Sequence, residues 1–517
     1  MTEPVASTPP AESVQDLRMR RRNQAERRFK LYGQIAIGIA VSFLAILLIS
    51  ISFRAASAFS RHMLVLDLEP AVLTEPSELA VTDLNLAVRA ELMSQFPELS
   101  DDRVERAELY AMTPRLAVLP LLRELQEMTV PPQAPIAARL ALSDDVNLYL
   151  KGEIKTHRTV PVGDAGRLAR LSTGAYRLSD ADQDNFIAFQ DRLADPGAPS
   201  NDILISLSGA LFELADTAGA SLILNHLAGP VPALGEQASS PVNAIFLGSE
   251  TADRPLSNRQ IALLILMDDA GMIERRFNAS LFTNADSTYP ELAGAAAAIV
   301  GSLFTMLITA IFAIPVGIFA AIYLEEFAPK SRLTSVIEVN INNLAAVPSI
   351  IFGLLGAAVF LNTFDLPRSI PLVGGLVLGL LVLPTIIIAS RAALRSVPPS
   401  MREAALGLGA SKTQAVFHHV LPLAAPGILT GAIIAMARAL GETAPLLLIG
   451  MVAFVSDVPT SPNDEATVLP VLIYKWFSGS ERAWEPMTAA VIIILLTILI
   501  AMNLIAVLLR RRFERRW

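Results

Sequence analysis

Two charged residues, Arg438 and Glu442, interrupt an apolar stretch that covers residues 427–452. They are four residues apart, so on one helix they would share a face. A guanidinium presents five N–H donors that suit a tetrahedral oxyanion, and the carboxylate would hold the arginine when no anion is bound. The pair therefore predicts an anion path through the middle of a span. The alternative is a closed ion pair that only stabilises helix packing.

Neighbouring residues extend this candidate path. Gly441 and Pro445 flank Glu442 and predict a kinked segment that can move, and we assign Thr443 to the same path. Arg391, at the end of an earlier apolar stretch, would either help an anion leave or only anchor its helix. Three polar residues at the start of another stretch predict hydrogen bonds between helices: Glu338, Asn342 and Asn343.

A polar loop over residues 395–426 carries a second candidate site. Pro398 and Pro399 break the preceding helix, Ser400 is a good N-cap, and Glu403 three residues later completes a capping box. The sequence therefore predicts a short helix that starts near Met401. Small residues give this helix a bare face that a partner protein could approach closely: Ala404, Ala405, Gly407, Gly409 and Ala410.

Other chemistry is poorly represented. The chain has no cysteine, which excludes disulfides and Cys-based zinc sites, and its five histidines show no metal-binding spacing. No catalytic constellation argues for an enzyme. The run Gly407–Lys412 lacks the spacing of a phosphate-binding loop, so we expect no ATPase site and no bound cofactor in this chain. We also expect no metal and no nucleic-acid partner.

The elements that must position these residues are membrane spans. The chain has 517 residues, 53% of them hydrophobic, and a mean hydropathy of +0.49. The run 31–53 has no charge and is long enough to span. Ala56-Ser57-Ala58 after it resembles a signal-peptidase site, but the run is longer than a secretory signal, which favours a retained anchor. Five further apolar stretches follow: about 292–324, 333–361, 370–390, 427–452 and 487–509.

Charge divides the chain by side of the membrane. Residues 55–290 hold 18 Lys and Arg against 32 Asp and Glu, whereas the cytoplasmic loops and both ends are basic. The positive-inside rule then predicts six spans with both termini in the cytoplasm and residues 55–290 in the periplasm. The expected parts are a disordered basic tail 1–30, a first helix 31–53, a soluble domain 55–290, a membrane domain 291–510 with a cytoplasmic loop 395–426, and a basic tail 511–517.

The sequence of the inserted domain at 55–290 predicts a mixture of α-helices and β-strands. Residues 69–127 predict mostly helices, 146–176 predict strands, and 259–267 predict a short buried strand. The apolar segment 203–227 carries Glu213 and Asp216 at its centre, so it predicts soluble helix and strand rather than a span. No motif indicates what this domain binds. The predicted fold class is therefore a six-helix α-helical membrane protein with an inserted α/β domain between the first two spans.

The loop 395–426 resembles the EAA loop of ABC-importer permeases. The matching residues are Glu403, Ala404, Ala405, Gly409, Leu421 and Pro422. One position departs from that family, which usually has an aliphatic residue where His419 stands. The resemblance implies a type I importer core and a coupling helix that docks on a separate ATP-binding subunit, which uses ATP and Mg²⁺.

A second resemblance is to phosphate permeases of the PstA type. It rests on Arg438-x-x-Gly441-Glu442-Thr443-Ala444-Pro445 and on residues 340–353 and 383–391. It implies phosphate import through a bacterial inner membrane, with a PstC-type permease as heterodimer partner, an ATPase dimer and a periplasmic phosphate-binding protein. The first 290 residues look like the extended N-terminal region of some members.

Two alternatives to phosphate import stay open. One is transport of another oxyanion, sulfate or molybdate, which the same charged pair would also suit. The other is a membrane phosphate sensor that uses residues 55–290 as its ligand-binding domain, or a transporter that also reports phosphate status to a sensor kinase. No output module follows the spans, which argues against a pure sensor.

Overall fold

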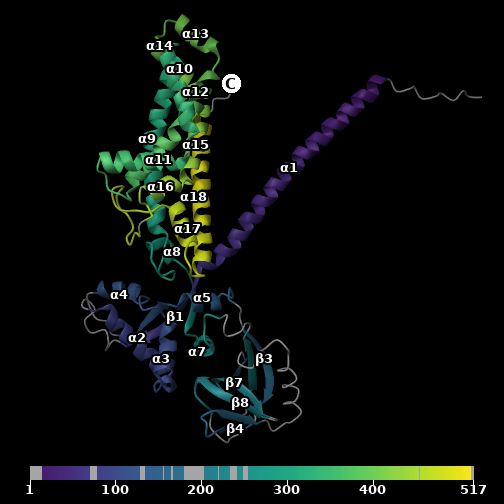
Figure 1. Ribbon diagram of the computed structural model, residues 1–517, viewed down its shortest axis with the longest axis vertical. Helices are drawn as coiled ribbons and strands as arrows, with labels where there is room; N and C mark the ends of the chain where they lie inside the picture. The colour runs from purple at the N-terminus through teal and green to yellow at the C-terminus, as the bar shows by residue number, and fades with distance from the viewer. Residues whose placement is uncertain are drawn as a thin grey trace, which may run out of the picture.

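The computed structural model describes residues 14–69, 79–128, 134–154, 157–164, 167–179, 203–218, 221–232, 241–247, 254–452 and 454–513. Figure 1 shows a helical bundle with sheets at one end and a long N-terminal helix, α1 (Val14–Ala58), that leaves the bundle from that same end. Short helices lie at the opposite end. The sheets and those short helices are therefore separated by the length of the bundle.

The helices of the bundle are long and apolar. Within the described residues five helices are long and apolar enough to cross a membrane, or six if a bent helix pair counts as one span. The bundle contains α9 (Ala296–Ile322), α10 (Arg332–Ala345), α11 (Ser349–Gly356), α12 (Pro371–Arg395), α15 (Leu421–Leu440) and α18 (Trp484–Phe513). The chain is thus a helical membrane protein.

The bent pair corrects one expectation. Residues 333–361 predict a single span, but α10 and α11 meet at 104°. Pro348, at the N-cap of α11, has no N–H to continue the α10 ladder. The π-helix η6 (Ala357–Thr363) completes this arm.

Helix α12 is the centre of the bundle and packs on α9 and α15. Small residues allow the close approach: a Cβ added to Gly375 would meet the Thr305 carbonyl oxygen of α9 at 2.8 Å. The hydroxyl of Thr309 donates to the Gly375 carbonyl at 3.1 Å, so the helix pair also shares a buried hydrogen bond. Gly431 of α15 meets Ala389 of α12 in the same way.

Shorter elements complete the bundle. Two of them are π-helices at the ends of long helices, where one turn is widened by a residue. The two π-helices are η5 (Tyr323–Phe327) and η7 (Ala415–Val420). The other short elements are the α-helices α13 (Pro399–Gly407), α14 (Lys412–Gln414), α16 (Ala444–Leu448) and α17 (Leu469–Phe477).

A three-stranded antiparallel sheet, in the order β10-β1-β2, lies next to the bundle. Its strands are β1 (Ser60–Leu68), β2 (Ile136–Ala141) and β10 (Ile273–Phe277). Leu64, Leu66 and Leu140 point from one face into an apolar core shared with helices. The helices and turns around this sheet are α2 (Val81–Gln95), η2 (Pro97–Leu99), α3 (Arg103–Ala111), α4 (Leu119–Gln126), α5 (Asp144–Leu150), α7 (Asn258–Asp269) and α8 (Ser280–Thr283).

A second antiparallel sheet has seven strands in the order β3-β9-β6-β7-β8-β5-β4. Alternating apolar residues such as Ile205, Phe212 and Leu224 fill its core. The strands are β3 (His157–Asp164), β4 (Arg167–Arg170), β5 (Tyr176–Ser179), β6 (Ile203–Leu207), β7 (Ala210–Ala218), β8 (Ser221–Ala228) and β9 (Pro241–Leu247).

Three local predictions for this region were wrong. Residues 146–150, expected to begin a strand, lie in helix α5. Residues 259–267 form helix α7 instead of a strand, because Ser257 and Gln260 make a full capping box that starts a helix. Residues 203–218 and 221–227 form strands β6 to β8, and these described stretches contain no helix. The turn at Ser208 and Gly209 has positive φ at both residues, 51° and 82°, which is the geometry of a tight hairpin.

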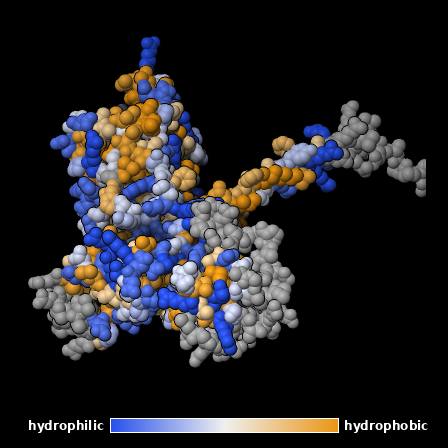
Figure 2. Space-filling model, turned by 60° about the horizontal axis from the view of Figure 1, so that its bottom comes forward, coloured by the Kyte–Doolittle hydropathy of each residue, from blue (hydrophilic) through white to orange (hydrophobic). Residues whose placement is uncertain are grey.

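Helix α1 is longer than the predicted first span. Residues 14–30, expected in a disordered tail, are helical, and Glu26 pairs with Lys30 one turn later at 2.6 Å. The helix packs on α18 near its C-terminal end. Over residues 31–50 its apolar side chains, such as Phe43 at 72% exposure, stay uncovered by the rest of the chain, and Figure 2 shows an orange band along this helix.

Candidate functional site

The Arg438–Glu442 pair lies at a helix break. Helix α15 ends at Leu440 with Gly441 as its C-cap, so Arg438 is in the last turn and Glu442 lies beyond the helix. This corrects the prediction that both residues share one continuous helix in mid-span. The short helix α16 restarts the chain at Ala444, with Pro445 in its first turn. The kink predicted from Gly441 and Pro445 is therefore a complete interruption of the helix.

The charged pair is open to a partner. Arg438 Nε lies 3.4 Å from Glu442 Oε1, and the side chains are 48% and 21% exposed. A long contact with this exposure leaves most guanidinium N–H groups free to bind another group. Thr443 forms the N-cap of α16 through its backbone, since its carbonyl accepts from Leu446 N and Leu447 N at 3.1 Å.

Arg391 is not part of that cluster. Its side chain is 11% exposed and its guanidinium contacts Glu325 of η5 at 3.4 Å and Glu338 of α10 at 2.6 Å. These ion pairs tie α12 to two neighbouring elements. They favour the anchoring interpretation of Arg391 over a role in anion release, and they give Glu338 an ionic partner on another helix.

The loop 395–426 contains the predicted short helix, but its cap differs from the prediction. Helix α13 starts at Pro399 with Pro398 as N-cap, and no side chain caps it. Ser400 therefore lies inside the first turn, because proline at the first helical position already fixes φ and lacks an N–H that would need a partner. The other end is closed by Gly409, whose φ of 89° is the left-handed conformation of a helix C-terminus.

A buried ion pair holds α13 against the bundle. Arg402 Nη2 lies 2.7 Å from Glu326 Oε1 of η5, and Arg402 Nε lies 3.1 Å from the same oxygen. Arg402 also donates to the carbonyls of Val397 and Leu394 at 2.8 Å. Glu326 is 7% exposed and Arg402 is 24% exposed, so the contact is mostly shielded from solvent. Sequence reasoning missed this pair, although two glutamates at the end of an apolar run were a visible signal.

The opposite surface of α13, here named the α13 face, is exposed and mixed in character. Glu403 and Ala404 are exposed, while Ala405 is buried against the loop. Leu406 and Leu408 are 48% and 90% exposed, and large apolar side chains with this exposure are typical of a protein interface. The α13 face therefore offers a partner both charge and apolar surface.

The remaining predicted coupling residues lie behind this helix. Leu421 is half-buried and begins α15, and Pro422 is exposed in the first turn of the same helix. His419 is exposed in η7, so the departure from the family pattern places no polar group in the core. The loop residues thus gather at one end of the bundle, and Arg438, Glu442 and Thr443 gather at the α15 break.

No metal centre emerges from the geometry. Across the described parts of residues 14–513, no three His, Cys, Asp or Glu side chains come close enough together to hold a metal ion. The acidic residues of the loop region, Glu325 and Glu326, are engaged by arginines instead.

Comparisons with known proteins cover both halves of the chain. Residues 313–516 match the model for "Binding-protein-dependent transport system inner membrane component", and residues 16–159 match a domain of unknown function, DUF3333. The phosphate transport system permease protein PstA 1 of Mycobacterium tuberculosis strain CDC 1551 is 32% identical over 219 residues, 42% of this chain and 71% of that protein.

Two further comparisons gave the following similarities. The phosphate transport system permease protein PstA of Haemophilus influenzae is 32% identical over 206 residues, 40% of this chain and 71% of that protein. Among solved structures, an inward-facing MetNI methionine ABC transporter aligns with a TM-score of 0.35 at 18% identity, over 42% of this chain and 97% of that one.

Proposed function

This chain belongs to the family of PstA-type permeases of binding-protein-dependent ABC transporters, and from that premise we propose that it carries inorganic phosphate across the inner membrane. The transport step would be driven by ATP hydrolysis on a separate subunit. The relatives named above are phosphate transport permeases, and the exposed arginine at the α15 break supplies a group that suits the same anion.

The observation that carries the proposal is the α13 face. A short helix with exposed Glu403, Leu406 and Leu408 projects at the end of the bundle away from the sheets (Figure 1). The Arg402–Glu326 pair connects this helix directly to the end of α9. A push on α13 by an ATP-binding subunit would therefore reach a long helix of the bundle through one buried ion pair.

The proposal extends to the partners that the family resemblance implies. We propose an ATP-binding dimer on the α13 face, a PstC-type permease against the exposed side of α15, and a phosphate-binding protein at the sheet end. The α13 end would then lie in the cytoplasm and the sheets in the periplasm. ATP and Mg²⁺ would be used by the partner ATPase, with no cofactor on this chain.

The anion path is proposed at Arg438. When phosphate arrives, the guanidinium would exchange its 3.4 Å contact with Glu442 for shorter charge-assisted hydrogen bonds to the anion. Thr443 and the interrupted helix would provide backbone groups at the same level. Arg391 would act as an anchor for α12 rather than as a path residue.

Uptake of radiolabelled phosphate tests the proposal in cells that lack the native permease and carry the cognate partner subunits. Wild type should restore uptake, whereas Arg438→Ala and Glu403→Lys should each reduce it at least tenfold. Matched controls are Arg332→Ala, an exposed arginine on α10, and Thr413→Lys, which adds a lysine beside α13 but outside it. Membrane levels of every variant are verified by immunoblot.

The outcomes separate the parts of the proposal. Wild type that moves no phosphate contradicts the substrate, and uptake of labelled sulfate or molybdate would then identify another oxyanion. Normal uptake by Arg438→Ala would make the arginine structural. Normal uptake by Glu403→Lys would remove the α13 face as the coupling surface.

A further inference from the structure

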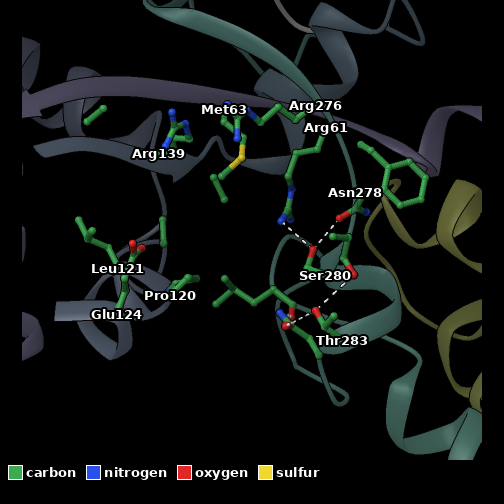
Figure 3. Close-up of a pocket in the computed structure, with 17 residues that line it drawn as sticks. Arg61, Met63, Pro120, Leu121, Glu124, Arg139, Arg276, Asn278, Ser280 and Thr283 are labelled. Atoms are coloured by element: carbon green, nitrogen blue, oxygen red, sulfur yellow. Dashed lines mark hydrogen bonds between the residues drawn. The ribbon is translucent and has the colours of Figure 1, made fainter. Parts of the chain in front are cut away.

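A cavity of about 390 Å³ lies at the sheet end, away from both Arg438 and the α13 face. It is half open to solvent and is bordered by the β10-β1-β2 sheet, helix α4 and the segment 276–284 that leads toward α9 (Figure 3). This volume is within the range of small-molecule sites in proteins. The cavity therefore lies between the small sheet and the segment of the chain that leads into α9.

One face of the small sheet forms a wall of the cavity. Arg61 and Met63 of β1, Arg139 of β2 and Arg276 of β10 line it, whereas the alternate residue Leu64 points into the apolar core on the other face. The register therefore places three guanidinium groups on one side of a sheet only three strands wide. Figure 3 shows Arg61 reaching into the cavity toward Ser280.

Two of these arginines face each other directly. Arg61 is the cross-strand partner of Arg276 in the β1–β10 pairing. Like charges at directly opposite positions destabilise a sheet. The fold tolerates this arrangement on a face that borders a cavity, where a bound anion would remove the repulsion.

The nearby carboxylates neutralise the arginines only in part. Glu274 pairs with Arg276 at 2.8 Å and with Arg139 at 3.6 Å, so one carboxylate serves two guanidinium groups. Glu124 of α4 lines the far side of the cavity. The lining thus carries three positive charges against one negative charge, with Glu274 beside it.

Arg61 has the weakest compensation. Among the described residues no carboxylate lies within ion-pair distance of it, and its guanidinium donates to Ser280 Oγ at 3.2 Å. Asp144 and Glu291 act on it at longer range, and burial lowers the pKa of Arg61 despite them. A half-buried cation with spare donors favours a tetrahedral oxyanion that can accept several of them.

We propose that this cavity binds a phosphate group, carried either by inorganic phosphate or by a phospholipid headgroup. Arg61, Arg139 and Arg276 supply the charge, and Thr283 supplies a neutral polar group. The lipid source is a real alternative because exposed Phe277 and Phe282 stack beside the cavity, at a ring distance of 6.1 Å, as aromatic residues do at headgroup level.

This site is independent of the proposed transport path. Its residues come from β1, β2, β10 and the segment before α9, whereas Arg438 lies at the end of α15. Occupation would link the sheet to the entry of α9 through shared contacts with one anion. Binding of a phosphate group at this cavity can therefore be tested without knowing which anion the chain transports.

The test uses the full chain purified in dodecyl maltoside, with lipid removed, and isothermal titration with inorganic phosphate. Every protein carries Arg438→Ala so that the transport path does not contribute. We expect saturable binding that Arg61→Gln and Arg139→Gln each weaken at least tenfold. The matched control is Arg275→Gln, an exposed arginine on the same strand as Arg276 that does not line the cavity, which should leave binding unchanged.

A second arm identifies the source of the phosphate group. Native mass spectrometry counts phospholipids retained after phosphatidylglycerol is added back in detergent. A retained lipid that is lost in Arg61→Gln and kept in Arg275→Gln, without binding of inorganic phosphate, assigns the site to a headgroup. If neither ligand depends on Arg61 or Arg139, the proposal is overturned. Arg139, which is 44% exposed, keeps the test valid if Arg61→Gln does not fold.

Discussion

The two ends of the molecule arrange their charged side chains differently. At the α13 end, arginine meets carboxylate: Arg402 with Glu326, and Arg391 with Glu325 and Glu338. At the sheet end, like charge meets like, with Arg61 opposite Arg276. Ion pairs between opposite charges fix the positions of both side chains. Neighbouring like charges repel each other, and a bound ligand of opposite charge can remove that repulsion.

The contrast extends to the acidic groups of the sheet end. Asp144 at the start of α5 lies close to Glu291, just before α9, and Glu291 is 7% exposed. A rigid connection suits the coupling role proposed for the α13 face, and a cluster of like charges suits a surface that responds to its surroundings. Three measurements of stability test this difference between the two ends.

The largest effect is expected at the α13 end. Arg402→Ala leaves Glu326 buried without its partner, so the free energy of unfolding in urea should fall by about 3 kcal/mol. The double variant Arg402→Gln with Glu326→Gln should recover part of this loss, because no unpaired charge remains.

Arg395→Ala is the matched control for that variant. Arg395 is 59% exposed and shares Glu325 with Arg391, so its loss should cost less than about 1 kcal/mol. Equal losses for Arg402→Ala and Arg395→Ala would show that the α13 end holds its charges no more tightly than an ordinary surface.

The second effect is a pH dependence at the sheet end. Burial, then the Glu291 carboxyl, raises the pKa of Asp144 to about 8, with Arg61 opposing the shift and Glu481 adding to it. Between about pH 4 and pH 8 the folded state keeps a proton that the unfolded state releases. The free energy of unfolding should therefore decrease as pH rises, by at most about 1.4 kcal/mol per pH unit, and level off above about pH 8.

Urea unfolding at pH 6 and pH 8 measures this slope. Asp144→Asn should flatten it, because the amide keeps the neutral form at both values, whereas Asp101→Asn at an exposed site should not. A wild-type slope that Asp144→Asn leaves unchanged would remove the like-charge description of the acidic pair.

The smallest effect concerns the two facing arginines. In phosphate-free buffer, Arg276→Gln should raise the free energy of unfolding by about 0.5 kcal/mol, because Arg61 loses its like-charged neighbour while Glu274 keeps Arg139. Thermal denaturation in detergent measures the change. A loss of stability instead would mean that the Arg276–Glu274 contact outweighs the repulsion.

Some of this architecture could be predicted from the sequence because composition alone determines it. The apolar runs of α9, α12 and α18 are long enough to span, and the resemblance to PstA-type permeases is confirmed by the comparisons. The break at Gly441 had a local signal in Gly441 and Pro445. Its full extent had none, because a kinked helix and an ended helix share the same residues.

The failures have physical causes as well. Helix α7 is apolar on most sides, and a short apolar run does not distinguish a buried helix from a buried strand. Ser400 has the right chemistry for a cap, but Pro398 and Pro399 start the helix two positions earlier. The Arg402–Glu326 pair joins residues 76 positions apart, a distance over which spacing carries no information.

The π turn η5 limits which mutations this segment can accept. Its Ala328 N–H bonds to the Tyr323 carbonyl five residues back, at 2.8 Å, so the turn holds one residue more than an α turn. Deletion of a single codon here would restore an α turn and rotate the remaining residues of the segment by about 100°. Glu325 and Glu326 would then face away from the arginines that they now engage. In this segment the number of residues is therefore constrained as strictly as their identity.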